Sequence, residues 1–370
     1  MGNNNGNNGK ADGLAITGWG IVSPIGIGRD QFRQGVSDKR QAQKSVSDYP
    51  SFVPLATACR AEFDTVAFLG PKGTRTMDRT TAMSVAAVGM ALSDSGVRER
   101  YDASRIGVVV GTSTGSVKSA SDFIKETLVN EKPYLVNPAL FPNTVMNCAA
   151  GNAAIWHRLS GVNSTISAGH LSGLVGMRYA SMAIRAGRAD AIVAGGVEEF
   201  CEQSAWAYHH LTAGGTRTTR PLGEGSAAFV LERRTDNGHS ALAEILGIEV
   251  GVYGRQQPNE QAAGLAAVIK RALTRAQLQP SDIAAVSLQG SDESYLSRIE
   301  QAGLREGLSG FEPPLQIAIG EQIGESFSAA NALQVAALLA SFAQSNDTPR
   351  IGLVTAVGTN GSVGCMLVKR

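Results

Sequence analysis

Apolar positions along the chain alternate between short runs typical of strands and longer stretches with helical periodicity. In the first part of the chain, strands are predicted at 14–18, 106–111, 164–168, 191–195 and 227–231. The helix predicted to begin near Asp78 repeats apolar or small residues every three or four positions: Val85, Val88, Gly89 and Leu92. Strands that alternate with helices indicate right-handed βαβ units and an α/β fold.

The same alternation restarts after the polar stretch 233–240. Strands are predicted at 242–252, 284–288, 315–319, 351–357 and 365–368, with a helix that carries apolar residues through 265–273. The stretch 329–342 is small or apolar around its circumference, which indicates a helix enclosed on several sides, as between two sheets. We therefore expect two similar βα halves, residues 13–238 and 239–370. The Asn- and Gly-rich residues 1–12 are expected to be a disordered tail.

Charge and composition restrict the possible partners. The chain has 33 Lys and Arg against 32 Asp and Glu, so neither nucleic acid nor an anionic membrane is an expected partner. No apolar run of 18 residues and no signal peptide is visible, and a cytoplasmic location is expected. The four cysteines are far apart and lack C-x-x-C spacing, so we expect neither a metal site nor a disulfide framework.

The segment 165–173 has the form of a strand that turns through small residues into a helix continuing to Arg185. At such a turn the helix dipole and the free N–H groups stabilise an anion, which is why enzymes place an activated Cys or Ser there. This chain places His170 at that position.

Several ordered segments resemble motifs of the β-ketoacyl synthases, a family of the thiolase superfamily. They are the opening strand and turn 14–26, Met77-Asp78-Arg79, the segment 141–147 with Gly151, the segment 194–198 and Gly358-Thr359-Asn360. The resemblance implies the thiolase fold, a layered α/β/α/β/α architecture. It also implies that the segment 138–147 lies at a two-fold interface between subunits.

The residues that carry condensing chemistry in this family are changed here. Condensing members use an elbow Cys, two His and a supporting Lys. The resemblance assigns His170 to the Cys position, Gln289 and Glu325 to the His positions and Gly320 to the Lys position. Because a neutral imidazole forms only a labile acyl adduct, we expect no intact catalytic set and no condensation by this chain alone.

If the family geometry holds, His170, Gln289 and Glu325 surround one cavity. A carboxylate that faces an imidazole is expected to raise the pKa of His170 and to lower that of Glu325, which would give a buried ion pair. The pair has two interpretations, a rewired general acid or base and a plugged, hydrogen-bonded relic. We favour the relic, because perturbed polar groups also occur in purely structural networks.

These defects resemble those of the chain length factor, or ketosynthase β, of type II polyketide synthases. That subunit lacks the elbow Cys and pairs with an active ketosynthase. The implied partners are a catalytic ketosynthase α subunit, in a heterodimer, and an acyl carrier protein. No cofactor is expected to bind directly; the phosphopantetheine-linked acyl chain of the carrier protein is reached by way of the partner. The residues expected at the partner's acyl tunnel are Thr114, Leu140, Phe141 and Pro142.

Two alternatives remain open at this stage. The first is a stand-alone thiolase-fold enzyme that uses His170 and Glu325 for acyl transfer, hydrolysis or decarboxylation. The second is a homodimer that binds acyl chains or carrier protein without turnover. A polar cluster of His209, His210, Arg217 and Arg220 could bind phosphopantetheine or an acidic carrier protein, but we interpret it as a solvated loop.

Overall fold

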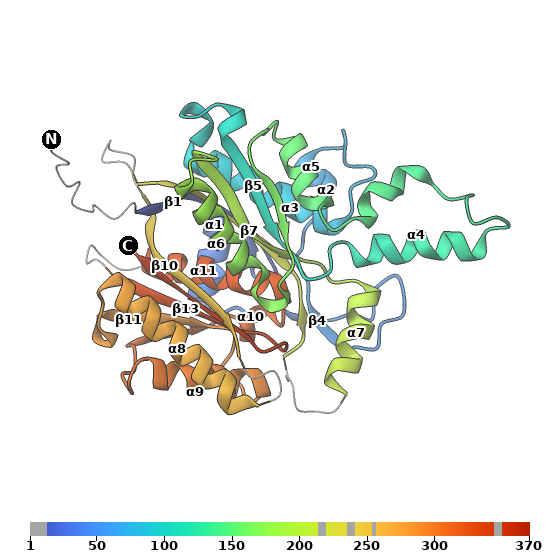
Figure 1. Ribbon diagram of the computed structural model, residues 1–370. Helices are drawn as coiled ribbons and strands as arrows, with labels where there is room; N and C mark the ends of the chain where they lie inside the picture. The colour runs from blue at the N-terminus through green and yellow to red at the C-terminus, as the bar shows by residue number, and fades with distance from the viewer. Residues whose placement is uncertain (1–12, 214–219, 235–240, 254–256, 344–349) are drawn as a thin grey trace.

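A computed structural model describes residues 13–213, 220–234, 241–253, 257–343 and 350–370. Its strands form two halves that join where β1 pairs with β10 (Figure 1). The first half has the strand order β1 (Leu14–Ser23), β9 (Gly225–Arg233), β7 (Ala191–Glu198), β5 (Ile106–Gly111) and β6 (Asn163–Ile166). The second has the order β10 (Ala243–Val252), β14 (Ser362–Lys369), β13 (Ile351–Val357), β11 (Ile283–Leu288) and β12 (Leu315–Ala318).

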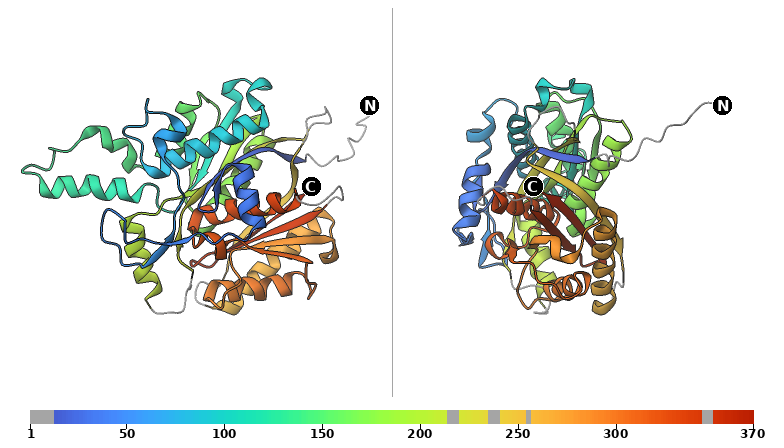
Figure 2. Two further views of the ribbon diagram at one scale, coloured as in Figure 1. Left: turned by 180° about the vertical axis from the view of Figure 1, so that it is seen from behind. Right: turned by 90° about the vertical axis from the view of Figure 1, so that its left-hand side faces the viewer.

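Helices cover the outer faces of both halves. In the first half these are α3 (Arg79–Ser95) and α5 (Cys148–Trp156), and in the second α8 (Pro258–Ala276) and α9 (Tyr295–Gly307) (Figures 1 and 2). The remaining helices are α1 (Arg29–Ser37), α2 (Thr65–Leu69), α4 (Val117–Val129), α6 (Ser172–Arg185), α7 (Glu202–Thr212), α10 (Gly320–Ile323) and α11 (Ala330–Phe342). The short strands are β2 (Gly26–Ile27), β3 (Gln43–Ser45), β4 (Thr57–Cys59) and β8 (Leu222–Gly223).

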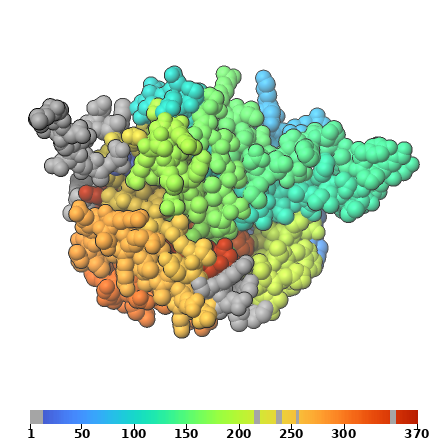
Figure 3. Space-filling model, in the orientation of Figure 1, coloured from blue at the N-terminus to red at the C-terminus, as the bar shows by residue number. Residues whose placement is uncertain are grey.

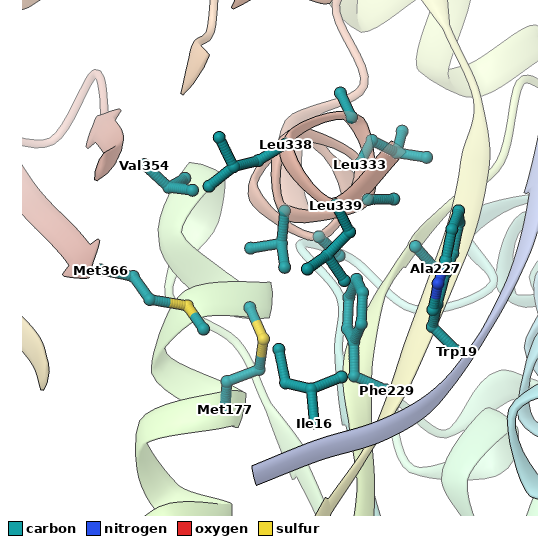
Figure 4. Close-up of a cluster of buried hydrophobic side chains, with 14 of the residues drawn as sticks. Ile16, Trp19, Met177, Ala227, Phe229, Leu333, Leu338, Leu339, Val354 and Met366 are labelled. Carbon is teal, nitrogen blue, oxygen red and sulfur yellow. The ribbon is translucent and has the colours of Figure 1, made fainter. Parts of the chain in front are cut away.

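The helices α6 and α11 form the central layer. Both contact strands of the two halves, and twelve residues of α11 are buried. Ile16 and Phe229 from the first half and Val354 and Met366 from the second belong to the same core cluster as Leu338 of α11 (Figure 4). The predicted enclosed helix and the layered thiolase fold are therefore confirmed.

Strand direction differs from the expected run of βαβ units. Within the large sheet, the described strands pair parallel where β5 meets β6 and β7, and where β11 meets β12 and β13. In the small sheet, β4 also pairs parallel with β8. In contrast, β9 pairs antiparallel with both β7 and β1. The antiparallel pair β13 and β14 is joined by only four residues, 358–361, and a connection that short can form a hairpin but not a parallel crossover.

The segment from α4 to the 3-10 helix Pro138–Thr144 projects from the body as an arm, hereafter the α4 arm (residues 117–146) (Figures 1 and 3). No residue of α4 is buried, although the helix carries Phe123, Ile124 and Leu128. A helix with an uncovered apolar face gains little from packing within its own chain.

Candidate functional site

The predicted elbow lies between β6 and α6. After β6 the chain forms a 3-10 turn, Gly169–Leu171, in which Gly169 has a φ of +57° that favours glycine. The N–H of Ala168 donates to Ser172 Oγ at 2.9 Å, and that hydroxyl donates to the carbonyl of Gly169 at 2.6 Å. These bonds fix the turn and direct His170 into the interior, where only 5% of the residue is exposed.

The other three predicted positions lie together. Gln289 follows β11, while Gly320 opens α10 and Glu325 follows it. Because β11 and β12 are parallel, the segments that leave their carboxyl ends lie side by side. Gln289, Gly320 and Glu325 line one small cavity of about 10 Å³, and His170 approaches Glu325 with 3.8 Å between Nε2 and Oε1.

Arg220, which sequence reasoning assigned to a solvated loop, is the main partner of Glu325. Its side chain is 4% exposed, and its Nη2 donates to Glu325 Oε2 at 2.8 Å. Its Nη1 lies 3.5 Å from Ser297 Oγ and 3.7 Å from Asp292 Oδ1. The solvated-loop prediction is therefore wrong for Arg220. His209 and His210 are exposed beside Trp206, and Arg217 is outside the described residues.

The charge distribution also differs from the expected His170–Glu325 ion pair. Burial lowers the pKa of His170, and this effect outweighs the opposing influence of Glu325. Burial alone would raise the pKa of Glu325, but the Arg220 guanidinium and, to a smaller extent, His170 hold it below its ordinary value. The ion pair is thus Arg220 with Glu325, and the predicted rise in the pKa of His170 is wrong, because desolvation of the imidazolium exceeds its attraction to a carboxylate already paired.

A second buried network lies behind Gln289. Its N–H donates to Glu300 Oε2 at 3.0 Å, and Glu300 accepts a further bond from the Thr355 hydroxyl at 2.6 Å. Burial raises the pKa of Glu300 to about 7. The side-chain Oε1 of Gln289 accepts from the N–H of Val357 at 3.3 Å, while the Nε2 of the same amide has no partner among the described residues. The small cavity has room for about one water molecule beside this amide.

The expected tunnel residues are outside this cluster. Thr114 is exposed, and its Oγ1 is 3.5 Å from the buried carboxylate of Glu198. The neighbouring Gly115 packs on Met146, since a Cβ there would be 3.1 Å from Met146 Cα. Leu140, Phe141 and Pro142 lie on the α4 arm, with Leu140 half-buried and the other two exposed.

This arrangement has little capacity for acyl chemistry. His170 and Glu325 are too far apart for a hydrogen bond, and a cavity of about 10 Å³ cannot accept an acyl chain. Across the described ranges, no cluster of three or more His, Cys, Asp or Glu residues is placed to hold a metal ion. Within the same ranges, no helix is both long and apolar enough to cross a bilayer.

Comparison with known proteins defines the family. The model of the β-ketoacyl synthase N-terminal domain matches residues 11–237, and that of the C-terminal domain matches residues 242–353. Together they span most of the chain, so the chain belongs to the β-ketoacyl synthase family.

Among curated relatives, 3-oxoacyl-(acyl-carrier-protein) synthase 2 of Vibrio harveyi is 26% identical, and the alignment covers 92% of this chain and 88% of that protein. A solved ishigamide ketosynthase/chain length factor is 31% identical with a TM-score of 0.85, covering 96% of this chain and 99% of that one. A chain from a solved complex of a type II PKS acyl-carrier protein with its ketosynthase has the same fold, with a TM-score of 0.81 at 19% identity and coverage of 97% of this chain and 100% of that one.

Proposed function

We propose that this chain is a non-condensing, ketosynthase-like subunit, a chain length factor, that pairs with a catalytic β-ketoacyl synthase in type II polyketide biosynthesis. The observation that carries the proposal is the site itself. Where condensing relatives hold a nucleophile, this chain holds a buried His170 beside an Arg220–Glu325 ion pair, with about 10 Å³ left over. Such a subunit serves a reaction that takes place on another chain.

The chemistry of the site favours a non-catalytic subunit over an enzyme that acts alone. Transfer of an acyl group from a carrier thioester needs a nucleophile that holds the acyl group, and imidazole releases it too readily. Decarboxylation or hydrolysis by His170 needs space for substrate next to the ring, and Phe327 and Glu325 already occupy its surroundings. The geometry therefore favours neither of these activities.

The α4 arm supports pairing with a second chain. It exposes a run of large apolar side chains, and α5 adds one nearby: Ile124, Leu128, Val129, Tyr134, Leu135, Phe141, Val145, Met146 and Ile155. Clustered exposed apolar residues of this size are typical of surfaces that bind another protein. Because a similar solved protein is named ketosynthase/chain length factor, we infer that the partner is a ketosynthase.

In this proposal the carrier protein delivers its phosphopantetheine-linked acyl chain to the partner ketosynthase. Leu140, Phe141 and Pro142 of the arm, together with Thr114, would border the partner's tunnel and limit how far a chain extends. Forcing extra bulk into a rigid apolar tunnel typically costs about 1 to 3 kcal/mol, enough to set a length limit.

Co-purification tests the pairing. The full chain is expressed alone and together with a candidate ketosynthase that retains its Cys and both His, and the masses in solution are measured. We expect a one-to-one complex. A stable homodimer that does not bind the ketosynthase would contradict the proposal and favour an acyl- or carrier-binding homodimer.

A further inference from the structure

We propose that Arg220 and Glu325 form an internal plug, and that this plug, not only the absence of a cysteine, closes the site. The inference rests on the proposed function, because a closed site suits a subunit that holds no acyl chain. The experiment measures how accessible the elbow is to a reagent, not whether product forms. The plug and the proposed function can therefore be contradicted independently of each other.

Hydrogen bonds of the backbone hold the segments of the two residues side by side. The N–H of Glu325 donates to the carbonyl of Pro221, and the N–H of Gly223 donates to the carbonyl of Glu325, both at 2.8 Å. Tyr208 Oη donates to the carbonyl of Arg220 at 2.5 Å. The segments that carry the plug are therefore also held together by hydrogen bonds that do not involve the ion pair.

The surrounding backbone is shaped to admit the guanidinium. A Cβ on Gly290 would lie only 1.6 Å from Arg220 Nη1, so any other residue would collide with the arginine. A Cβ on Gly320 would lie 2.0 Å from the Gln289 carbonyl oxygen and 3.5 Å from Arg220 Cδ. Gly320 is the position assigned to the family's lysine, and a lysine there would collide with the Gln289 backbone.

Glu325 connects the plug to the elbow. One carboxylate oxygen accepts from Arg220, and the other accepts from the N–H of Phe327 at 3.2 Å and lies 3.8 Å from His170 Nε2. Phe327 has a φ of +41°, which is unfavourable for a residue with a side chain, and its ring centre lies 5.0 Å from that of His170. The strained turn thus places an aromatic ring over the elbow residue, and the carboxylate bonds to the N–H of that turn.

A thiol at the elbow can report whether the plug closes the site. All four native cysteines are buried, and burial raises the pKa of Cys59 and of Cys365 to about 12 and that of Cys201 to about 11, so background labelling by a maleimide is low. H170C places the reporter at the elbow. S167C, three residues earlier at an exposed position, is the accessible control.

The full chain, with its ketosynthase if the two purify as a pair, is labelled with N-ethylmaleimide, and the labelled peptides are identified by mass. We expect H170C to react at least about 100-fold more slowly than S167C, as a site that opens only by local unfolding does. The triple variant H170C/R220S/E325S is expected to react within about tenfold of S167C, and H170C/R220K, which keeps the charge, is expected to stay slow.

Equal labelling of H170C and S167C would overturn the plug. So would a folded triple variant that labels as slowly as H170C. If the triple variant does not fold, H170C/E325A is measured instead, since Arg220 keeps Asp292 beside it there. At least about a tenfold acceleration is then expected, and an unchanged rate would overturn the proposal.

Discussion

At the scale of single residues, the Arg220–Glu325 pair predicts a large asymmetry between breaking the pair and replacing it. R220M alone leaves Glu325 as a buried carboxylate without its main partner, and E325L alone leaves Arg220 with only the more distant Asp292, 3.7 Å away. Each is expected to lower the free energy of unfolding, R220M by about 3 to 5 kcal/mol. The double variant R220M/E325L, apolar and similar in volume, is expected to cost clearly less than the sum of the two changes. Urea denaturation of the four proteins measures both quantities.

The control is K270M, which breaks the exposed pair between Lys270 and Glu306, with side chains 50% and 56% exposed. It is expected to cost less than about 1 kcal/mol. Additive losses at positions 220 and 325, each no larger than that of K270M, would show that the buried pair is not the organising contact of the site.

Glu300 predicts a pH dependence of stability. Burial raises its pKa from 4.5 to about 7 in the folded protein, so between these values the folded state binds more protons than the unfolded state. Its contribution is therefore present at acidic pH and is lost as the pH rises towards 7, by about 3 kcal/mol in total. E300Q should flatten the stability profile between pH 4.5 and 7, as measured by urea denaturation at each pH.

The same chemical change at an exposed carboxylate, E306Q, should leave the slope of the wild-type profile unaltered. A profile for E300Q that is parallel to the wild-type profile would show that Glu300 is already ionised in this range.

The residues that sequence reasoning assigned to the site differ in kind from Arg220, which it assigned to a solvated loop. His170, Gln289, Gly320 and Glu325 follow ends of strands or stand in motifs, so local pattern and family spacing located them. Arg220 is 105 positions from Glu325 in the chain and stands in a polar stretch. Gly290 and Gly320, which leave space for the arginine, were the available signal in the sequence. A glycine does not indicate which side chain occupies the space beside it.

At the scale of elements, the α4 arm predicts a separable partner surface. I124E/L128E replaces two side chains that are 58% and 79% exposed, so the chain itself should remain folded. The two introduced glutamates would be buried in the interface with the ketosynthase, and they should weaken binding at least about 100-fold. V252E, at an exposed apolar position of β10 that is 73% exposed, is the matched control and should pair normally.

Sedimentation or light scattering of the co-purified proteins reads the outcome. Normal pairing by I124E/L128E would remove the arm from the interface, whereas loss of pairing by V252E as well would point to a general effect of surface charge.

The 3-10 helix of the arm carries the expected length control. L140A or F141A removes bulk at the proposed tunnel border, and we expect products longer by at least one two-carbon unit, measured by mass spectrometry of the reconstituted system. V145A, from the same segment and also exposed, is the control. An unchanged product distribution in both test variants would exclude these residues from the gating role.

Elements inside the core were predictable, and the arm was not. The strands 106–111 and 351–357 have the predicted bounds, because continuous burial leaves a continuous apolar run. The α4 helix has a mixed sequence with no residue buried in its own chain. Its apolar residues are not covered within this chain, so burial left no continuous apolar run from which the helix could be predicted.

At the scale of the whole molecule, the two halves and the central layer place the elbow of the first half against the loops of the second. His170 comes from the first half, and Gln289 and Glu325 come from the second. The pattern of apolar residues predicted the enclosed helix layer, which is confirmed. It did not predict the Arg220–Glu325 ion pair, because a contact between side chains far apart in the sequence leaves no periodic signal. The antiparallel pairing of β9 and β14 with their neighbours was not predicted, because the order of strands and helices along the chain does not specify whether neighbouring strands run parallel or antiparallel.

The elbow histidine allows a whole-molecule test of catalysis. H170A in the complex with ketosynthase is expected to leave product formation unchanged, because the imidazole neither holds nor orients an acyl group in the proposed mechanism. Product formation and the mass of the complex are measured on the same sample, so that loss of product can be separated from loss of pairing. Loss of product from an intact complex would favour an enzyme that uses His170.

The most direct test is to give the purified chain, free of any ketosynthase, a carrier protein loaded with an acyl group and a second one loaded with malonyl, and to measure acyl adducts and elongated product by mass spectrometry. No stable adduct and no elongation are expected until the catalytic ketosynthase is added. Elongation by the isolated chain would contradict the account.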